Sequence, residues 1–232
     1  MRFSVMRALL SGFTCLCLIA MVVGCKSKPA KPKPDKVRQQ YQKYYRIFKD
    51  YRTVPLDSTI GQIDSFLLVF PEDARAWAFY GRLMYDADSA QKSIAAYKNA
   101  IRFNPRFSEG YAGVGSVYHV LNQADSAEYY LQKAVDLKDS SAYTFLNLSM
   151  LCQLTGKNEK CNEYADKAFM YGDSSAAVCT GLSYVYNQQK NKDRSEQMYA
   201  RAVQLGLTDT LGFKEVLEGK TPIQTFFRNN RY

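Results

Sequence analysis

The 232-residue sequence predicts an all-α solenoid, in which antiparallel helix hairpins stack one after another along the chain. Alanines recur at intervals of 34 residues, and other small and large apolar residues recur in register with them, which indicates a repeated helix pair. The alanines are Ala100, Ala134, Ala168 and Ala202. The composition, 47% hydrophobic and 23% charged, excludes wholesale disorder.

Residues 1–24 have the features of a secretory signal. Arg2 and Arg7 precede an uncharged, mostly apolar stretch that ends directly before Cys25. This order resembles the signal of bacterial lipoproteins, which implies that Cys25 is acylated and becomes the first residue of the mature chain. A retained transmembrane anchor is the alternative, because the apolar stretch is at the short limit for spanning a bilayer.

Residues 25–38 are expected to form a tether behind the lipidated cysteine. Prolines at 29, 32 and 34 fix φ and oppose a helix, while the lysines repel one another, so the segment should be an extended spacer of roughly 35–40 Å. The lysines either attract anionic lipid head groups or only keep the tether solvated. Surface-exported lipoproteins of some bacteria carry acidic residues after the cysteine, and Lys26-Ser27-Lys28 departs from that pattern, which favours the periplasmic side.

The net charge of +9 comes from the N-terminal part of the chain. Residues 26–52 hold ten basic and two acidic residues, whereas residues 53–232 hold 19 basic and 20 acidic residues. A nearly neutral body does not indicate a nucleic-acid-binding domain, and a secretion signal conflicts with one. We therefore expect no nucleic-acid partner.

Residues 39–73 are predicted to form a degenerate first hairpin. Its helices are expected over Gln39–Tyr51 and Ser58–Phe70, with Pro55 in the turn between them. Pro71 keeps the 34-residue frame, but Phe66 stands where the repeat has alanine.

Residues 74–207 carry the full repeat, in units expected at 74–107, 108–141, 142–175 and 176–209. Small residues recur at two levels where the two helices of a hairpin should cross, because a large side chain there would separate them. These residues are Gly81, Gly115, Ser149 and Ser183 on the first helices, and Ser93, Ala127, Cys161 and Ser195 on the second.

Residues 208–232 are predicted to cap the stack. Asp209–Glu218 resembles one more first helix with Phe213 at its centre, and Gly219 should end it. Thr221 and Pro222 then have the chemistry of a helix start. Atypical end units are expected, because an open stack must cover its exposed apolar faces.

The repeat resembles the tetratricopeptide repeat, whose pattern is W-x2-L-G-x2-Y, then A-x3-F, then A and P. Trp77, Gly81, Tyr97, Ala100 and Pro105 carry these positions in the first unit. Asp139 and Asp173 replace the proline in later units, and each is followed by Ser-Ser-Ala. Aspartate and serine are both good N-caps, so we expect this segment to cap the next helix. The resemblance implies a right-handed superhelix whose first helices line a concave, partner-binding face.

The resemblance also implies which residues face the groove. The mixture of aromatic and hydrogen-bonding side chains suits an extended peptide or a partner helix, and the alternative is a merely solvated inner surface. The carboxylate clamp of some family members is absent, so a chaperone tail is not implied. The implied groove residues are Arg75, Arg82, Tyr85, Glu109, Ser116, His119, Tyr143, Asn147, Met150, Gln153, Thr180, Tyr184 and Asn187.

The sequence lacks the motifs of catalysis and of metal or cofactor binding. The single histidine, His119, has no metal-ligand cluster, and no Cys-x-x-Cys, phosphate loop or nucleophile elbow is present. We therefore predict no enzyme, no metal site and no cofactor. Cys152, Cys161 and Cys179 fall on packing rows, and a disulfide between Cys152 and Cys161 is an alternative to free core thiols.

The function expected from these features is a lipid-anchored interaction module in the cell envelope, preferably on the periplasmic side of the outer membrane. It would bind a protein or peptide as a scaffold or assembly factor, of the secretion, pilus or outer-membrane assembly type. A regulator that activates a cell-wall enzyme is the alternative, and an envelope enzyme is disfavoured.

Overall fold

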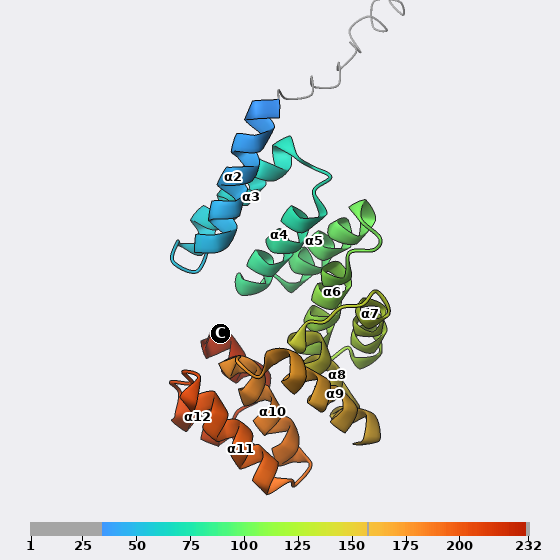
Figure 1. Ribbon diagram of the computed structural model, residues 1–232, viewed down its shortest axis with the longest axis vertical. Coiled ribbons are helices and arrows are strands. Elements are labelled where there is room, and N and C mark those ends of the chain that lie inside the picture. Colours follow the sequence, from blue (N-terminus) through green and yellow to red (C-terminus); the bar gives the residue numbers. More distant parts are fainter. Residues whose placement is uncertain (1–33, 157, 231–232) are drawn as a thin grey trace, which may run out of the picture. The chain divides into compact units, whose positions relative to one another are not determined.

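A computed structural model describes residues 34–156 and 158–230, and every regular element in these ranges is an α-helix (Figure 1). The predicted all-α class is therefore confirmed. The proposed signal, Cys25 and the tether up to residue 33 lie outside the described residues. Within the described part, no helix is long and apolar enough to cross a membrane. Residues 44–232 form one compact unit.

Four antiparallel hairpins occupy the centre of that unit, and the two helices of each pack against one another as in a solenoid (Figure 1). Their first helices begin 34 residues apart. The hairpins are α4 (Ala74–Asp86) with α5 (Ala90–Phe103), α6 (Ser108–Val120) with α7 (Ala124–Asp136), α8 (Ala142–Leu154) with α9 (Asn158–Gly172), and α10 (Ala176–Gln188) with α11 (Lys192–Gln204).

Two further helices lie on each side of the hairpins along the chain, and those on the C-terminal side are short. On the N-terminal side, α2 (Pro34–Asp50) begins within the segment expected to be extended, because proline is well tolerated at the first position of a helix. The next helix, α3 (Leu56–Val69), follows Pro55. On the C-terminal side lie α12 (Thr210–Leu217) and α13 (Ile223–Asn230), separated by Gly219 with φ 74°.

The small residues lie where the two helices of a hairpin touch, as the sequence predicted. In three hairpins a serine hydroxyl at this level also donates a hydrogen bond to a backbone carbonyl of the other helix. Ser93 donates to Gly81 at 2.7 Å, and Ser149 donates to Cys161 at 2.9 Å. Ser183 and Ser195 exchange two such bonds, each of 2.9 Å. These serines are therefore satisfied within the core.

The 34-residue period also appears in the backbone. The turn between the two helices of each hairpin has one residue with positive φ, at Asp88 (54°), Asn122 (56°), Gly156 (72°) and Lys190 (60°). This left-handed conformation favours glycine or asparagine. The sequence of the turns does not reveal this shared positive φ, because only one of the four residues is glycine.

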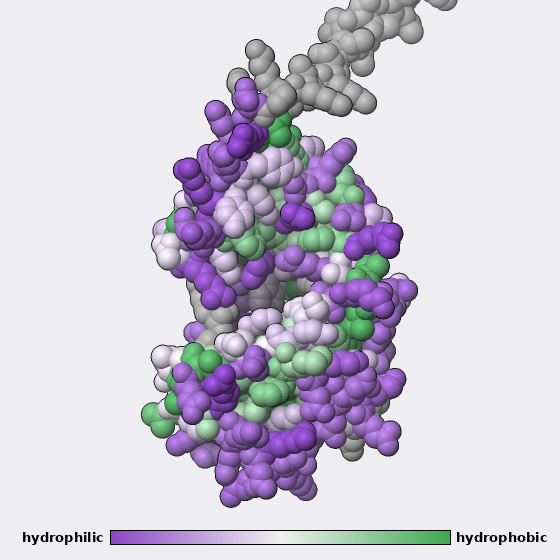
Figure 2. Space-filling model, in the orientation of Figure 1, coloured by the Kyte–Doolittle hydropathy of each residue, from purple (hydrophilic) through white to green (hydrophobic). Residues whose placement is uncertain are grey.

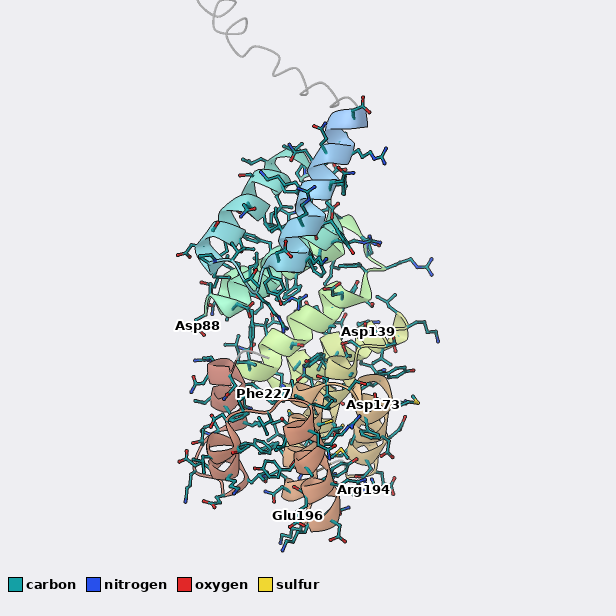
Figure 3. The ribbon with its side chains drawn as sticks, turned by 60° about the vertical axis from the view of Figure 1, so that its left-hand side comes forward. Asp88, Asp139, Asp173, Arg194, Glu196 and Phe227 are labelled. Carbon is teal, nitrogen blue, oxygen red and sulfur yellow. The ribbon has the colours of Figure 1, made fainter. Side chains whose placement is uncertain are left out.

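Serines, rather than the aspartates that replace proline, occupy the N-cap positions of α8 and α10. The N-caps are Ser141 and Ser175, and the Ser175 hydroxyl accepts a hydrogen bond from the Val178 amide at 3.4 Å. Asp139 instead accepts hydrogen bonds from Ser108 and Thr144, and so links α6 to α8 (Figure 3). The expected cap within each Asp-Ser-Ser segment is thus supplied by its second serine and not by the aspartate.

The packing predicts that Gly115→Leu destabilises the protein. A Cβ at this position would lie 2.6 Å from Leu131 Cγ and 3.0 Å from the Leu131 backbone nitrogen. Overpacking at such a contact should lower the free energy of unfolding by about 1–3 kcal/mol, measured by urea denaturation. Gly61→Leu is the control, because a Cβ at Gly61 in α3 meets nothing within 4 Å. It should be neutral or stabilising by up to about 0.8 kcal/mol, and equal losses for both variants would contradict the packing account.

Candidate functional site

The candidate site is the first-helix face, by which we mean the surface formed by α4, α6 and α8 with α10. These first helices contact one another in chain order, so their outward positions form one continuous surface. All thirteen residues implied for the groove lie on these four helices. The structure nevertheless divides them into exposed, buried and covered positions.

Four of the thirteen residues are exposed and lie on three successive helices. Arg75 and Tyr85 come from α4, Glu109 from α6 and Tyr143 from α8. Tyr85 and Tyr143 keep 39% and 49% of their surface in solvent, so both rings can be contacted by a partner. The Tyr143 hydroxyl also contacts the Ser175 hydroxyl at 3.3 Å, which links α8 to the next unit.

His119, Met150 and Thr180 are buried, with 5%, 6% and 0% of their surface exposed. The Thr180 hydroxyl donates a hydrogen bond to the Ala176 carbonyl of its own helix at 2.8 Å. In this conformation none of these three side chains offers a surface to a partner. The close packing of neighbouring first helices is the physical reason.

A short hydrogen-bonded chain joins α6 to α8 at the first-helix face. The Asn147 amide donates to Ser116 Oγ at 2.9 Å, and Asn147 Oδ1 lies 3.3 Å from His119 Nδ1. Because Oδ1 can only accept, Nδ1 carries the proton of a neutral imidazole. Burial lowers the pKa of His119, with the bond to Asn147 opposing that shift. His119 therefore bridges two helices, and its Nδ1 partner is an amide rather than a catalytic carboxylate.

Aromatic side chains at the end of α2 and directly after it cover part of α4. The Arg82 guanidinium lies 5.9 Å from the Phe48 ring centre and 5.5 Å from that of Tyr51, so these rings hold it by cation–π attraction. Phe48 and Tyr51 also pack edge-on against Phe79. Sequence reasoning missed this contribution because α2 lies outside the regular repeat. Arg82 is consequently half-buried.

The C-terminal helices cover the fourth unit. The Asn187 amide donates to the Leu217 carbonyl of α12 at 2.9 Å, and Tyr184 packs against the core cluster that contains Phe213 and Phe226. The end of α13 also approaches the turn after α4, where Arg228 Nε lies 3.4 Å from Asp88 Oδ1 (Figure 3). The part of the face left for a partner is therefore that of the first three units.

No disulfide joins Cys152, Cys161 and Cys179, the cysteines of the described ranges, so the disulfide considered between Cys152 and Cys161 is not formed. Cys161 is completely buried, and its sulfur accepts a hydrogen bond from the Gln189 amide at 2.9 Å and lies 3.5 Å from Gln153 Oε1. Gln153 is thus turned toward this thiol. The three cysteine side chains pack in the hydrophobic core of the third and fourth units.

The remaining surface shows no cluster of metal-ligating side chains. Across the described ranges, no three histidine, cysteine, aspartate or glutamate side chains are grouped so that they could hold a metal ion. Hydrophilic residues cover most of the face shown in Figure 2, with smaller apolar areas between them. The arrangement provides aromatic rings, amides and isolated charges, which are groups for binding another molecule.

A sequence profile of the tetratricopeptide repeat matches residues 176–205. A UDP-N-acetylglucosamine–peptide N-acetylglucosaminyltransferase of Giardia intestinalis is 27% identical over 88 residues, which are 38% of this chain and 6% of that enzyme. This chain thus spans only a small fraction of that relative's length, so the relative's enzymatic activity is not attributed to this chain.

Solved structures show the same fold. TTC0263, a thermophilic tetratricopeptide-repeat protein of Thermus thermophilus, matches 78% of this chain and 98% of its own, with TM-score 0.66 and 17% identity. MamA from Desulfovibrio magneticus RS-1 matches 74% and 97%, with TM-score 0.54 and 12% identity. YrrB, described as having an unusual peptide-binding site, matches 74% and 88%, with TM-score 0.50 and 16% identity. The fold is that of a tetratricopeptide-repeat solenoid.

His119 makes the stability of the protein depend on pH. The folded state holds the imidazole neutral, with a pKa below its ordinary value of about 6.5, whereas the unfolded chain takes up a proton near that pH. The free energy of unfolding should therefore fall as the pH drops below about 6.5, by at most about 1.4 kcal/mol per pH unit, and should not change on this account above it.

His119→Gln should abolish this contribution, because an amide does not titrate in this range. The measurement is chemical denaturation of both proteins at several values between pH 5 and 8, followed by subtraction of one curve from the other. Since the chain has one histidine, NMR titration of the wild type gives the imidazole pKa directly. A midpoint at or above pH 6.5 would overturn the assignment of a buried neutral imidazole.

Proposed function

We propose that the protein is a lipid-anchored scaffold or assembly factor of the cell envelope, which holds a protein or peptide partner on the first-helix face of its first three units. The tetratricopeptide-repeat fold supports a role in protein–protein interaction, since proteins with this fold bind protein or peptide partners. They are generally scaffolds rather than enzymes, which agrees with the arrangement of this face.

The observation that carries the proposal is the exposed set Arg75, Tyr85, Glu109 and Tyr143 on three successive helices. Tyrosine rings give contact area at a low cost in conformational entropy, and the charged residues add hydrogen-bonding groups around them. Because the fourth unit is covered by α12 and α13, the partner would occupy a segment of the solenoid rather than its whole length. This favours an extended peptide or one helix of a partner.

The location of the scaffold is proposed from the sequence of the N-terminal segment. The apolar stretch before Cys25 supports export and acylation, and the lysine- and proline-rich tether would keep the folded body near the membrane without embedding it. The residues after Cys25 support retention on the periplasmic side of the outer membrane. A partner would then be a subunit or client of an envelope machine.

Tyr143→Ala should weaken partner capture while leaving stability nearly unchanged. The ring is half exposed, so its removal creates no cavity in the core. Truncation of a tyrosine at the centre of an interface weakens binding by about tenfold or more. Tyr129→Ala is the control, because Tyr129 is 58% exposed but lies on α7, a second helix of its hairpin.

The measurement is cross-linking of the full-length protein in intact cells, followed by purification, quantitative mass spectrometry and thermal melts of each variant. The proposal expects one partner in stoichiometric amount with the wild type and with Tyr129→Ala, and much less with Tyr143→Ala. Equal capture by all three proteins would move the binding surface away from the first-helix face.

Cys25→Ser should abolish acylation and release the protein from membranes. The thiol is the proposed acyl acceptor, and the acyl chains would supply nearly all of the membrane affinity. Labelling with a fatty-acid analogue and fractionation of the cells measure both effects, with Cys179→Ser as a control on a buried cysteine. An unprocessed Cys25→Ser protein that stays fully in the membrane would instead identify residues 1–24 as a retained transmembrane anchor.

A further inference from the structure

Helix α2 is oriented by the contacts of its inner face. Ile47 is only 9% exposed and packs in a cluster with Phe66 and Phe79. The Tyr44 ring stacks on Phe66, with 4.7 Å between the ring centres. These contacts fix the rotation of the helix about its axis, so the residues of the opposite side, spaced three and four positions apart, form a defined outward face.

The outward face of α2 carries tyrosine rings between basic residues. Arg38, Tyr41, Tyr45 and Lys49 follow one another at intervals of three, four and four residues, so they lie in one stripe along the helix. Tyr41 keeps 41% and Tyr45 keeps 68% of its surface in solvent, and both basic residues are also exposed. The stripe therefore presents aromatic surface flanked by positive charge.

The charge of this segment differs from that of the body. Residues 34–52 hold six basic and two acidic residues, whereas residues 53–232 hold 19 basic and 20 acidic residues. Within residues 34–156 and 158–230, Arg38, Arg46 and Lys49 take part in no ion pair, so the body does not neutralise their charges. The outward face of α2 consequently complements an anionic surface.

Two features favour a lipid bilayer as that surface. Tyrosine has an apolar ring and a polar hydroxyl, which suits the level of the lipid head groups, and long basic side chains can reach phosphates around the ring. The second feature is the place of α2 in the chain. Pro34 follows Cys25 by nine residues, so an acylated Cys25 would keep the start of α2 within about 30 Å of the membrane.

We propose that the outward face of α2 binds the surface of an anionic bilayer, with the rings of Tyr41 and Tyr45 at the level of the head groups and Arg38 and Lys49 against lipid phosphates. The proposal rests on the proposed function, because the acyl anchor brings the helix to the surface. The acyl chains retain the protein at the membrane, whereas α2 holds the body in one orientation there. Each basic residue near such a surface strengthens binding by about fivefold, and salt screens this attraction.

The test is fluorescence quenching of the full-length protein, reconstituted from detergent into vesicles whose phosphatidylcholine carries brominated acyl chains. The vesicles contain phosphatidylcholine alone or with about one third of the anionic phosphatidylglycerol. Tyr45→Trp places a reporter on the stripe. Tyr129→Trp is the matched control, because Tyr129 is 58% exposed on α7. Trp77 is the one tryptophan of the natural sequence, and its emission in the wild type is subtracted.

The emission of the Tyr45→Trp reporter should fall by about twofold in the anionic vesicles, and little in phosphatidylcholine alone or at high salt. The Tyr129→Trp reporter should not be quenched. Adding Arg38→Glu and Lys49→Glu to the Tyr45→Trp protein should reduce its quenching to the level in phosphatidylcholine alone.

The control for this charge reversal is Lys92→Glu with Arg106→Glu, which changes the net charge equally at two exposed residues of the first repeat unit. It should leave the quenching unchanged. Equal quenching of both reporters, equal quenching in both kinds of vesicle, or quenching that survives Arg38→Glu with Lys49→Glu would overturn the proposal.

Flotation of the same vesicles measures the anchor separately. A protein that floats with phosphatidylcholine vesicles, but whose Tyr45→Trp reporter is not quenched in the anionic ones, would overturn the role of α2 and leave the anchor intact. Such a result would leave the outward face to a protein partner. A protein that does not float with phosphatidylcholine vesicles would overturn the anchoring in the proposed function, and quenching confined to anionic vesicles would still support the role of α2.

Discussion

The two helices of each hairpin cross at a level where neither can carry a large side chain, and the rest of the fold depends on that close approach. Where serine is used, the distance is short enough for its hydroxyl to reach the opposite backbone, as Ser93 does with Gly81 and Ser183 with Ser195. The crossing fixes the rotation of each first helix about its axis. It therefore decides which residues of α4, α6 and α8 face outward and which face the next unit.

The sequence predicted the helix pairs where the same packing constraint recurs in every hairpin. The small residues recur at 34-residue intervals because every hairpin has the same crossing, so the four regular hairpins could be predicted. The start of α2 at Pro34 could not, because proline opposes a helix interior but is suited to a first turn. The left-handed turn residues Asp88 and Lys190 gave no signal either, since their side chains are unrelated and only their φ angles agree.

The candidate site was less predictable, because its exposure depends on segments outside the repeat. Arg82 is held by the rings of Phe48 and Tyr51 at and after the end of α2, and Asn187 is bound by α12. Two positions that the repeat pattern directs outward are therefore occupied by the chain itself. His119 and Met150 are buried by the packing between first helices, which a pattern within one unit does not describe. The repeat pattern thus predicts in which direction a side chain points. The segments packed around that side chain determine whether a partner can reach it.

Hydrogen bonding explains how polar side chains can be buried where the first helices pack against one another. His119 is paired with Asn147, which is paired with Ser116, so this group is satisfied by the fold and adds specificity to the contact between α6 and α8. Thr180 is satisfied in the same way, because its hydroxyl donates to the Ala176 carbonyl of its own helix. His119 and Thr180 therefore belong to the packing of the fold, and contact with a partner falls to the exposed side chains of the same surface.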